Sequence, residues 1–292
     1  MPLSPLVIAC LAATWLIWGS TYLAIKFALA SFPPFYQMGS RFLVAGTLLL
    51  AWLWFRGRAL PTLIEWRNAL IIGTLLLVSG MGFTAYSEQT VASGLIVAYI
   101  AIIPIIVTAM NLPFGIKPSL LELCGMLVGV AGVLMLVRGE AFTASPTGLS
   151  AITIACVSWS LGSVLSPRLP LAPGAMGFAS EMLCGSIVLL VVAAAVGERP
   201  EWPPQPFAVG SWVYLIVFGS LIAFNAYMIL LGHVSAALAS SYTFVNPVIA
   251  MALGIWLGGE AVTAFEWAAA AVITAGVVLL VIGRRPRLSR IG

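Results

Sequence analysis

The chain has 292 residues, of which 62% are hydrophobic and only 8% are charged, and its formal net charge is +4. Soluble domains carry about 25% charged residues. A chain of this composition, with a mean hydropathy of +1.11, cannot bury its apolar surface in a water-soluble fold. The composition therefore predicts a protein whose solvent is lipid.

The apolar residues fall into ten runs that are separated by short polar breaks. A helix of about 20 apolar residues crosses the hydrocarbon core, so each run is a candidate membrane span. The breaks, such as Phe32-Pro33-Pro34, leave no room for a soluble domain. The expected spans are Leu6–Phe27, Phe35–Phe55, Ala69–Tyr86, Val91–Ala109, Leu120–Val137, Leu149–Leu165, Gly174–Val196, Ala208–Leu231, Ala236–Leu257 and Ala264–Ile282.

The first run is interpreted as a retained helix. The sequence Ala28-Leu29-Ala30 resembles the cleavage site of a signal peptide. However, no Lys or Arg precedes the run, and the run is longer than the roughly 7–15 apolar residues of a signal core.

The Lys and Arg residues set the expected orientation, because positive charges gather in cytoplasmic loops. A cytoplasmic N-terminus places nine of them inside and three outside. We therefore expect a multi-pass protein of the plasma (inner) membrane with both termini in the cytoplasm. Residues 284–292 form a basic tail, which is expected beside anionic lipid rather than nucleic acid. The inner nine are Arg56, Arg58, Arg67, Lys117, Arg168, Arg284, Arg285, Arg287 and Arg290, and the outer three are Lys26, Arg138 and Arg199.

The second half of the sequence repeats the first. The pattern Val-x3-Leu-x3-Tyr-x4-Pro occurs at 91–104 and again 143 residues later, at 234–247. The pattern Glu-x9-Gly-Val-x5-Gly occurs at 122–139 and again 144 residues later. Upstream, Phe83-Thr84-Ala85-Tyr86 resembles Phe224-Asn225-Ala226-Tyr227. Ordered matches at a nearly constant displacement indicate an internal repeat.

Each repeat holds five of the expected helices, so the two repeats cross the membrane in opposite directions. The fold class is therefore predicted as an all-α integral membrane protein, with ten transmembrane helices in two inverted repeats around a central cavity. The first repeat is assigned to residues 1–140 and the second to residues 141–283. Inverted repeats are typical of secondary transporters, whose site lies at the repeat interface.

Two prolines occupy matching places in the fourth and ninth spans. Pro104 and Pro247 cannot donate a hydrogen bond, so each frees a backbone carbonyl within the membrane. One interpretation makes them hinges beside a binding site, and the other makes them bends that serve packing. Asn246 favours the first, because an amide within the membrane needs a partner. Tyr242 lies one helical turn from it and faces the same way.

With these motifs the chain resembles the ten-helix drug/metabolite transporter superfamily, and specifically its EamA-type carriers. The resemblance covers nearly all of the chain and rests on Trp18-Gly19, Arg41, Trp159-Ser160, Asn246-Pro247 and Leu257-Gly258-Gly259-Glu260. The first repeat departs from the pattern, since Phe114-Gly115-Ile116-Lys117 stands where a glycine–glutamate ending is expected. The resemblance implies a cavity with alternating access and the export of amino acids or other metabolites. The overall similarity is to the exporters of aromatic amino acids.

The candidate substrate-binding residues are aromatic and amide side chains of the repeated helices. Trp18 and Trp159 are either a stacking wall for the substrate or lipid-facing tryptophans. Asn225 is ranked above Tyr227 as the inward-facing residue, because an amide exposed to lipid is costly. The full set is Trp18, Thr84, Tyr99, Trp159, Asn225, Tyr242 and Asn246.

Two charges fall inside expected spans. Arg41 lies near the outer end of the second span and Glu181 near the inner end of the seventh. At 1.5 Å per residue their depths differ by roughly 10 Å, so a direct ion pair is not expected. Arg41 is expected to extend toward the interface or to tie helix ends, rather than to contact the substrate. Glu181 is a candidate to carry a coupling proton or to cap a helix, and the sequence leaves both open.

The other charged residues are expected at helix ends. Glu88, Glu260 and the sole histidine, His233, are interpreted as solvated or interfacial. Glu122 and Glu266 lie near the starts of their helices, where the helix dipole favours an anion.

The sequence thus predicts a secondary transporter for small amphipathic solutes, with neutral or aromatic amino acids first. Both uniport and proton-coupled transport remain open. Efflux of cationic drugs would require a carboxylate in the cavity, and only Glu181 is a candidate. A lipid scramblase or flippase and a membrane assembly factor are less favoured. No nucleotide-binding, acid–base or metal motif occurs, so we expect no enzyme, cofactor or metal, and a monomer or weak homodimer.

Overall fold

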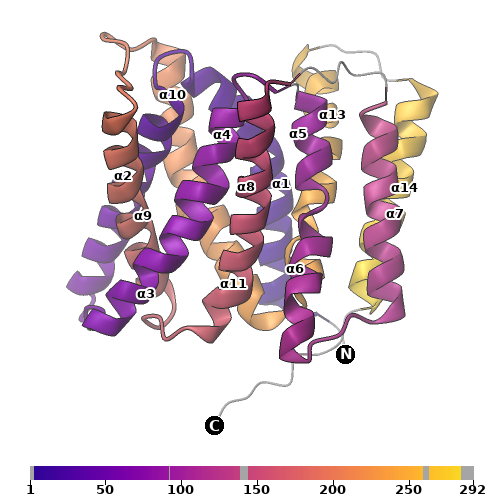
Figure 1. The fold of residues 1–292 in the computed structure, drawn as a ribbon, viewed down its shortest axis with the longest axis horizontal. Coiled ribbons are helices and arrows are strands. Elements are labelled where there is room, and N and C mark those ends of the chain that lie inside the picture. The colour runs from indigo at the N-terminus through magenta and orange to yellow at the C-terminus, as the bar shows by residue number, and fades with distance from the viewer. Residues whose placement is uncertain (1–2, 92, 139–143, 259–262, 284–292) are drawn as a thin grey trace.

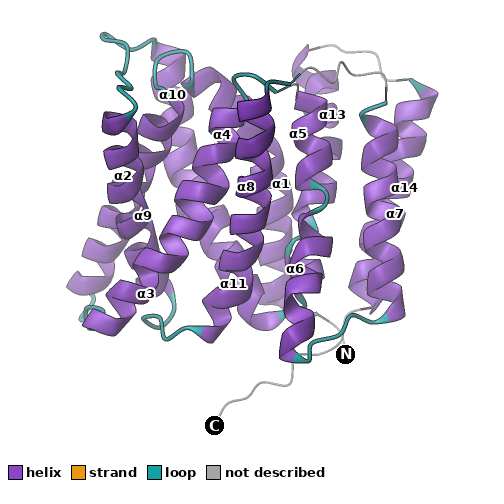
Figure 2. Ribbon diagram, in the orientation of Figure 1, coloured by secondary structure: helices purple, strands orange, loops and turns teal. Residues whose placement is uncertain are grey.

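The computed structural model describes residues 3–91, 93–138, 144–258 and 263–283, and these residues are almost entirely helical (Figure 2). One isolated β-bridge joins Val91 to Ala144. Nine helical segments are long and apolar enough to cross a membrane, and the helix at Leu120–Leu136 is slightly shorter. The ten expected spans are therefore found in the described part of the chain. The largest shift is in the third, which begins at Leu63 instead of Ala69.

The first five spans contain seven α-helices and a π-helical segment. The third span is continuous from α3 through the π-helix η1 into α4, whereas the fourth span is divided into α5 and α6. The bounds are α1 Pro5–Ala28, α2 Pro34–Phe55, α3 Leu63–Gly73, η1 Thr74–Gly82, α4 Phe83–Ser87, α5 Ser93–Ile100, α6 Ile103–Asn111 and α7 Leu120–Leu136.

The second five spans have the same plan. A π-helix again interrupts the third span of the repeat, and the fourth span is again divided. The bounds are α8 Pro146–Leu165, α9 Ala175–Ala195, α10 Pro206–Tyr214, η4 Leu215–Phe224, α11 Asn225–His233, α12 Ala236–Ala239, α13 Tyr242–Gly258 and α14 Ala264–Gly283. In the described residues two short 3₁₀ turns, η2 Leu112–Phe114 and η3 Ser166–Arg168, lie at span ends.

The spans stand side by side as a bundle, and the start of α1 and the end of α14 lie at the same edge (Figure 1). The two π-helices begin 141 residues apart, at Thr74 and Leu215. π-Helical turns are rare and frequently occur at functional sites. Their recurrence in the same span of each half is structural support for the internal repeat.

Glycines let some helices touch through their backbones. A Cβ atom on Gly276 of α14 would lie 2.7 Å from the backbone nitrogen of Gly129 in α7. A Cβ atom on Gly125 would lie 2.8 Å from the carbonyl oxygen of Gly276. Small residues permit this close approach, which stabilises helix pairs in membranes through packing.

The repeated glutamates close the first turns of α7 and α14. Glu122 accepts a hydrogen bond from the backbone N–H of Ser119 at 2.9 Å. Glu266 accepts one from the backbone N–H of Thr263 at 2.7 Å. Each helix therefore begins with a capping box, which satisfies two backbone donors. The expectation that these acids sit at helix starts is confirmed.

The prolines do not occupy equivalent places at the interruptions. In the fourth span the helix stops after Ile100 and restarts at Ile103, so Pro104 is the second residue of α6. A proline there loses no hydrogen bond, because the first turn has free N–H groups. In the ninth span the interruption lies between Ala239 and Tyr242, and Pro247 lies within α13. In place of the expected kinks at the two prolines, each span has a break before its proline. The break at 101–102 directly precedes the turn that holds Pro104, whereas the break at 240–241 lies further before Pro247.

Candidate functional site

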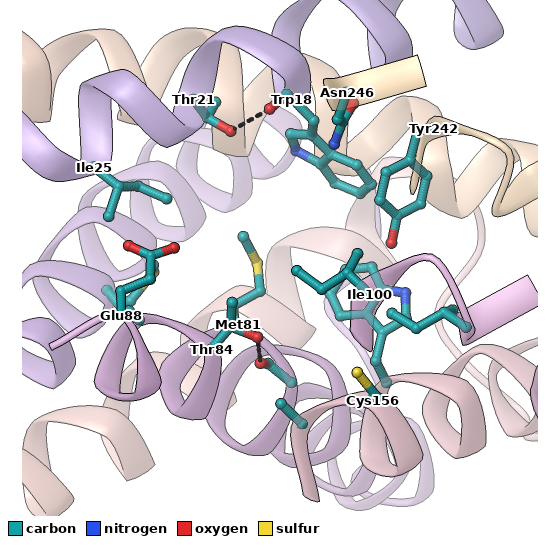
Figure 3. Close-up of a pocket in the computed structure, with 16 residues that line it drawn as sticks. Trp18, Thr21, Ile25, Met81, Thr84, Glu88, Ile100, Cys156, Tyr242 and Asn246 are labelled. Carbon is teal, nitrogen blue, oxygen red and sulfur yellow. Dashed lines mark hydrogen bonds between the residues drawn. The ribbon is translucent and has the colours of Figure 1, made fainter. Parts of the chain in front are cut away.

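A cavity of about 80 Å³ lies between helices of the two repeats. It is lined by α1, α2, η1 and α4 of the first repeat and by α8 and α13 of the second, with the α5–α6 break beside it (Figure 3). Most of its surface is apolar. The lining residues are Trp18, Thr21, Ile25, Met38, Gly80, Met81, Thr84, Ala85, Glu88, Ile100, Ile103, Ala155, Cys156, Trp159, Tyr242 and Asn246.

Aromatic rings form one wall of this cavity. The ring centroid of Trp18 lies 4.6 Å from that of Tyr242 and 5.7 Å from that of Trp159, and both pairs meet edge to face. Tyr227 packs behind them, with its centroid 5.2 Å from Trp159. Edge-to-face contacts at these distances are favourable for aromatic rings. The wall combines residues from both repeats.

Hydrogen bonds to the protein hold the two indole rings. Trp159 donates its Nε1–H to the Tyr227 hydroxyl at 3.1 Å, and that hydroxyl is 2.6 Å from Ser163 Oγ. Trp18 donates to the carbonyl oxygen of Gly219 in η4 at 3.4 Å. Because the polar edges of the indoles are satisfied internally, the rings offer the cavity apolar and π surface.

Close helix approach explains how the tryptophans reach the interior. A Cβ atom on Gly80 would lie 2.9 Å from Cε3 of Trp159, so this ring rests on the backbone of η1. A Cβ atom on Gly19 would lie 2.6 Å from Cβ of Ile249 in α13. Trp18 and Trp159 are each only 5% exposed, so the lipid-facing interpretation is wrong for both.

The polar groups of the cavity are mainly hydrogen-bond acceptors. Thr84 donates its hydroxyl to the Gly80 carbonyl at 2.8 Å, and Thr21 donates to the Trp18 carbonyl at 2.8 Å. Their oxygen lone pairs remain for a ligand. The Oδ1 atom of Asn246 is buried and has no hydrogen-bond partner among the described residues. A buried amide oxygen is usually satisfied, and in Figure 3 the amide nitrogen is the atom of Asn246 that points toward the cavity.

Glu88 is the charged residue of this cavity lining. It caps the end of α4, one residue beyond the third span, and is partly buried. The sequence interpretation placed Glu88 at a solvated or interfacial span end and did not assign it to the cavity lining. A signal was present: Met81, Thr84, Ala85 and Glu88 have helical spacing and all line the cavity.

Comparison with known proteins agrees with this architecture. The model of the EamA-like transporter family matches residues 5–138 and again 146–282. This chain belongs to the EamA-like transporter family. It is 43% identical over 275 residues to the "Uncharacterized inner membrane transporter YedA" of Escherichia coli (strain K12), covering 94% of this chain and 90% of that protein.

More distant relatives match over nearly the same length of the chain, at lower sequence identity. A protein of Synechocystis sp., described as an "Uncharacterized transporter", is 25% identical over 92% of this chain and 88% of its own length. A solved structure, described only as that of a protein, aligns with a TM-score of 0.80 at 21% identity. It covers 96% of this chain and 98% of that one, and it supports the fold alone.

Two sequence candidates of this EamA-family chain do not line the cavity. The Asn225 side chain donates to the carbonyl of Leu221 at 2.7 Å, within its own helix. Tyr227 is fully buried against the aromatic wall, so the ranking of these two residues is reversed. Tyr99 contributes its carbonyl oxygen, which accepts from Cys156 Sγ at 3.6 Å, while its neighbour Ile100 lines the cavity.

Arg41 and Glu181 are both buried outside the cavity lining. Gly39 of α2 lies against Leu190 of α9 and Gly46 lies against Leu183, so the helices are antiparallel. This register puts Arg41 about seven residues, or roughly 10 Å, from Glu181 along the axes. No hydrogen bond from the described residues reaches either Glu181 oxygen. The expected lack of pairing is thus found.

The expected extension of Arg41 toward the interface is wrong. Arg41 is 1% exposed, and its Nη2 atom lies 3.8 Å from the sulfur of Met81. Its Nε and Nη1 atoms have no hydrogen-bond partner within the described ranges. Because Met81 lines the cavity, the guanidinium stands one side chain behind it.

Other expected features fall outside this site or outside the described residues. Pro104 and Pro247 lie beside lining residues but do not line the cavity. Glu260 and the basic tail at 284–292 lie outside the described residues. Within the described ranges, no group of three or more His, Cys, Asp or Glu side chains is arranged to hold a metal ion.

Proposed function

We propose that this chain is a secondary transporter that exports small amphipathic solutes, with neutral and aromatic amino acids as the first class. The observation that carries the proposal is the wall of Trp18, Trp159 and Tyr242 in a cavity between the two repeats. Aromatic faces bind apolar and aromatic groups. The Asn246 amide and the threonine oxygens offer hydrogen bonds to the polar end of such a solute.

Alternating access is the mechanism that this arrangement favours. The wall joins α1 of the first repeat to α8 and α13 of the second, so a relative movement of the repeats would open or close it. The breaks at Ala101–Ile102 and Ser240–Ser241 are places where the fourth and ninth spans can bend. Pro104 and Pro247 follow these breaks and are proposed as parts of the hinges.

The proposed location is the inner membrane, as for the Escherichia coli relative, with both termini in the cytoplasm. The cavity lies between residues near the C-terminal ends of α1 and α4 and the N-terminal part of α2. These helix ends lie away from the edge at which α1 begins (Figure 1). In the proposed orientation the cavity therefore extends from the middle of the membrane, where Trp18 and Trp159 lie, toward its outer face.

A second class, cationic organic compounds, is favoured by one specific observation. Efflux of cations calls for a carboxylate in the cavity, and Glu88 supplies one. Glu181, the sequence candidate for this role, has no place in the lining. We keep Glu181 as a candidate for proton coupling, because an ionisable residue within a membrane span is a functional candidate.

Counterflow in proteoliposomes tests the proposal. Proteoliposomes that contain the purified protein are loaded with unlabelled L-phenylalanine or L-leucine. Entry of the labelled compound is then followed with and without a pH gradient. We expect saturable flux that falls at least about tenfold in Trp18→Leu and Tyr242→Leu, because the aromatic contact is lost. Sensitivity to the gradient would support proton coupling.

The matched control is Trp54→Leu, which makes the same chemical change at a side chain that is 56% exposed on α2. Its flux should equal that of the wild type. Equal losses in Trp18→Leu and Trp54→Leu would show a general effect on folding and contradict a binding role for the wall. Flux of neither amino acids nor cationic amines would contradict the proposed transport of these solutes.

A further inference from the structure

We propose that the Glu88 carboxylate selects the charge of the substrate, by binding the ammonium group of an organic amine whose apolar body lies against Trp18 and Tyr242. This inference rests on the proposed transport function and adds the chemical class of the ligand. It also assigns to Glu88 a role that the sequence analysis did not give it.

The position of Glu88 directs it into the cavity. Its backbone N–H donates to the Thr84 carbonyl at 3.1 Å, which continues the helical turn beyond α4. Glu88 therefore shares the helical face of Met81, Thr84 and Ala85, all of which line the cavity. The carboxylate also stands at the C-terminal end of the continuous helix α3–η1–α4, where the helix dipole is negative and favours a cation.

The charges around the cavity favour a cation over an anion. Among the described residues that line the cavity, Glu88 is acidic and none is basic, since none is Lys, Arg or His. The other polar lining groups, which include the threonine hydroxyls, the Tyr242 hydroxyl and the Asn246 amide, are uncharged, and both threonine hydroxyls donate to backbone carbonyls and so can accept from a ligand. An ammonium group supplies three donors to such a site, whereas a carboxylate would find no basic partner in the lining.

The basic residues near the site are separated from the cavity. Arg41 on α2 stands behind Met81 and contacts its sulfur. Lys26 on α1 is exposed. The other two elements that pack against α4 are η1 and α8. Neither has a charged residue in its sequence. Glu88 is thus the group that determines the sign of the charge a ligand can bring into the cavity.

The shape of the cavity matches an amphipathic amine. In Figure 3 the Glu88 carboxylate lies across the cavity from Trp18 and Tyr242, with Ile25 and Met81 beside the space between. A ligand with its ammonium at Glu88 therefore places its body on apolar and aromatic surface. Aromatic faces also attract cations, which adds to the preference for a positive ligand.

Binding of four matched probes to purified protein in nanodiscs tests the inference. Phenethylamine is a cation, L-phenylalanine a zwitterion, 3-phenylpropionate an anion and 2-phenylethanol neutral, while all carry the same phenyl group. We expect phenethylamine to bind most tightly and 3-phenylpropionate most weakly. In Glu88→Gln, phenethylamine should lose about tenfold or more in affinity, as expected when a partly desolvated charge partner is removed.

The neutral probe separates charge recognition from damage to the fold. The affinity for 2-phenylethanol should change less than about twofold in Glu88→Gln, because its phenyl contacts remain. Glu88→Asp should retain part of the preference for the cation. The matched control is Glu201→Gln, which removes a carboxylate from the loop before α10, where Glu201 contacts Ser31. This control should behave as the wild type with all four probes.

The outcomes distinguish this inference from the function on which it rests. Binding by the wild type with the same preference among the four probes in Glu88→Gln would overturn the role of Glu88 and leave the aromatic site intact. Equal binding of the cation and the anion by the wild type would do the same. Failure of all four probes to bind the wild type would overturn the proposed function and this inference with it.

Discussion

Tyr227 shapes the cavity without lining it. Its hydroxyl accepts the Nε1–H of Trp159 at 3.1 Å and lies 2.6 Å from Ser163 Oγ. Its ring lies 5.3 Å from that of Trp18, centroid to centroid. One side chain from the second repeat therefore orients both tryptophans of the wall.

Tyr227→Phe should weaken this support. The change leaves the Trp159 indole N–H without its buried acceptor, which costs about 1–3 kcal/mol, while the Ser163 hydroxyl keeps its bond to the Trp159 carbonyl. We expect a lower midpoint of thermal unfolding in detergent and a higher apparent KM for counterflow. The control is Tyr86→Phe, at a side chain that is 39% exposed and stacked on Phe35. An unchanged midpoint in Tyr227→Phe would contradict the supporting role of the hydroxyl.

Glu88 should make ligand binding depend on pH. Burial raises the pKa of Glu88 to about 7, and the raised value favours the protonated form below that pH. A cation needs the ionised form, so the affinity for phenethylamine should rise by up to about tenfold from pH 6 to pH 8. The affinity for 2-phenylethanol should stay constant over the same range. A flat profile for the cation, or an equal slope in Glu88→Gln, would refute this dependence.

The errors of sequence interpretation at the residue scale have local physical causes. Asn225 was expected to turn inward because an exposed amide is costly, but its Nδ2–H satisfies itself on the Leu221 carbonyl. The π-helix η4 adds a residue per turn, which rotates the following side chains by about 100° relative to an α-helix. A helical projection of the eighth span with 3.6 residues per turn therefore does not identify Tyr227 as the residue that faces the aromatic wall.

At the scale of elements, the close packing of α7 on α14 depends on glycine. Gly276→Ala should separate these helices, because the new methyl group would lie 2.7 Å from the backbone nitrogen of Gly129. Backbone atoms of a helix cannot move aside as a flexible side chain can. We expect a loss of about 1–3 kcal/mol in stability, as for overpacking, measured as a lower unfolding midpoint.

Gly210→Ala provides the matched control for this prediction. Gly210 is also helical, in α10, and a Cβ atom there would meet no atom within 4 Å. Alanine is the better helix former, so the midpoint should be unchanged or higher. A Gly276→Ala protein as stable as Gly210→Ala would show that the helix pair tolerates separation.

Hydropathy identifies the spans because each needs a long apolar stretch to cross lipid. It is less informative where a helix is interrupted. The sequence placed the kinks of the fourth and ninth spans at Pro104 and Pro247, but the helices stop before both prolines. The breaks are set by tertiary packing and by local turns. In one such turn the Thr243 N–H donates a hydrogen bond to the Ser240 carbonyl at 3.1 Å. Local propensity cannot reveal such contacts.

At the scale of the whole molecule, the sequence identified aromatic residues of the candidate cavity but not its charged residue. Matching positions in the two repeats identified Trp18, Trp159 and Tyr242, which the structure brings together. The same reasoning missed Glu88, because the end of a span is the usual place for a solvated acid. Glu88 enters the cavity lining through the packing of α4 against α8, η1 and α2, which the sequence does not reveal.

The proposed orientation makes a prediction about which face of the membrane reaches the cavity. In a cysteine-free background, Thr84→Cys should react in intact cells with a small cationic thiosulfonate that does not cross the membrane. Thr84 lines the cavity beside Glu88, and its hydroxyl donates to the Gly80 carbonyl of its own helix. We therefore expect the protein to tolerate the replacement of this threonine by cysteine. Phenethylamine should slow the reaction by occupying the same space.

His233→Cys reports the opposite face in the same background. His233 is exposed at the end of α11, and the proposed topology puts it in the cytoplasm. It should react only after the cells are permeabilised. Reaction of His233→Cys in intact cells, with Thr84→Cys protected, would reverse the orientation. Because positive loop residues set the orientation, the imbalance of nine basic residues against three would then have to be outweighed by another topological signal.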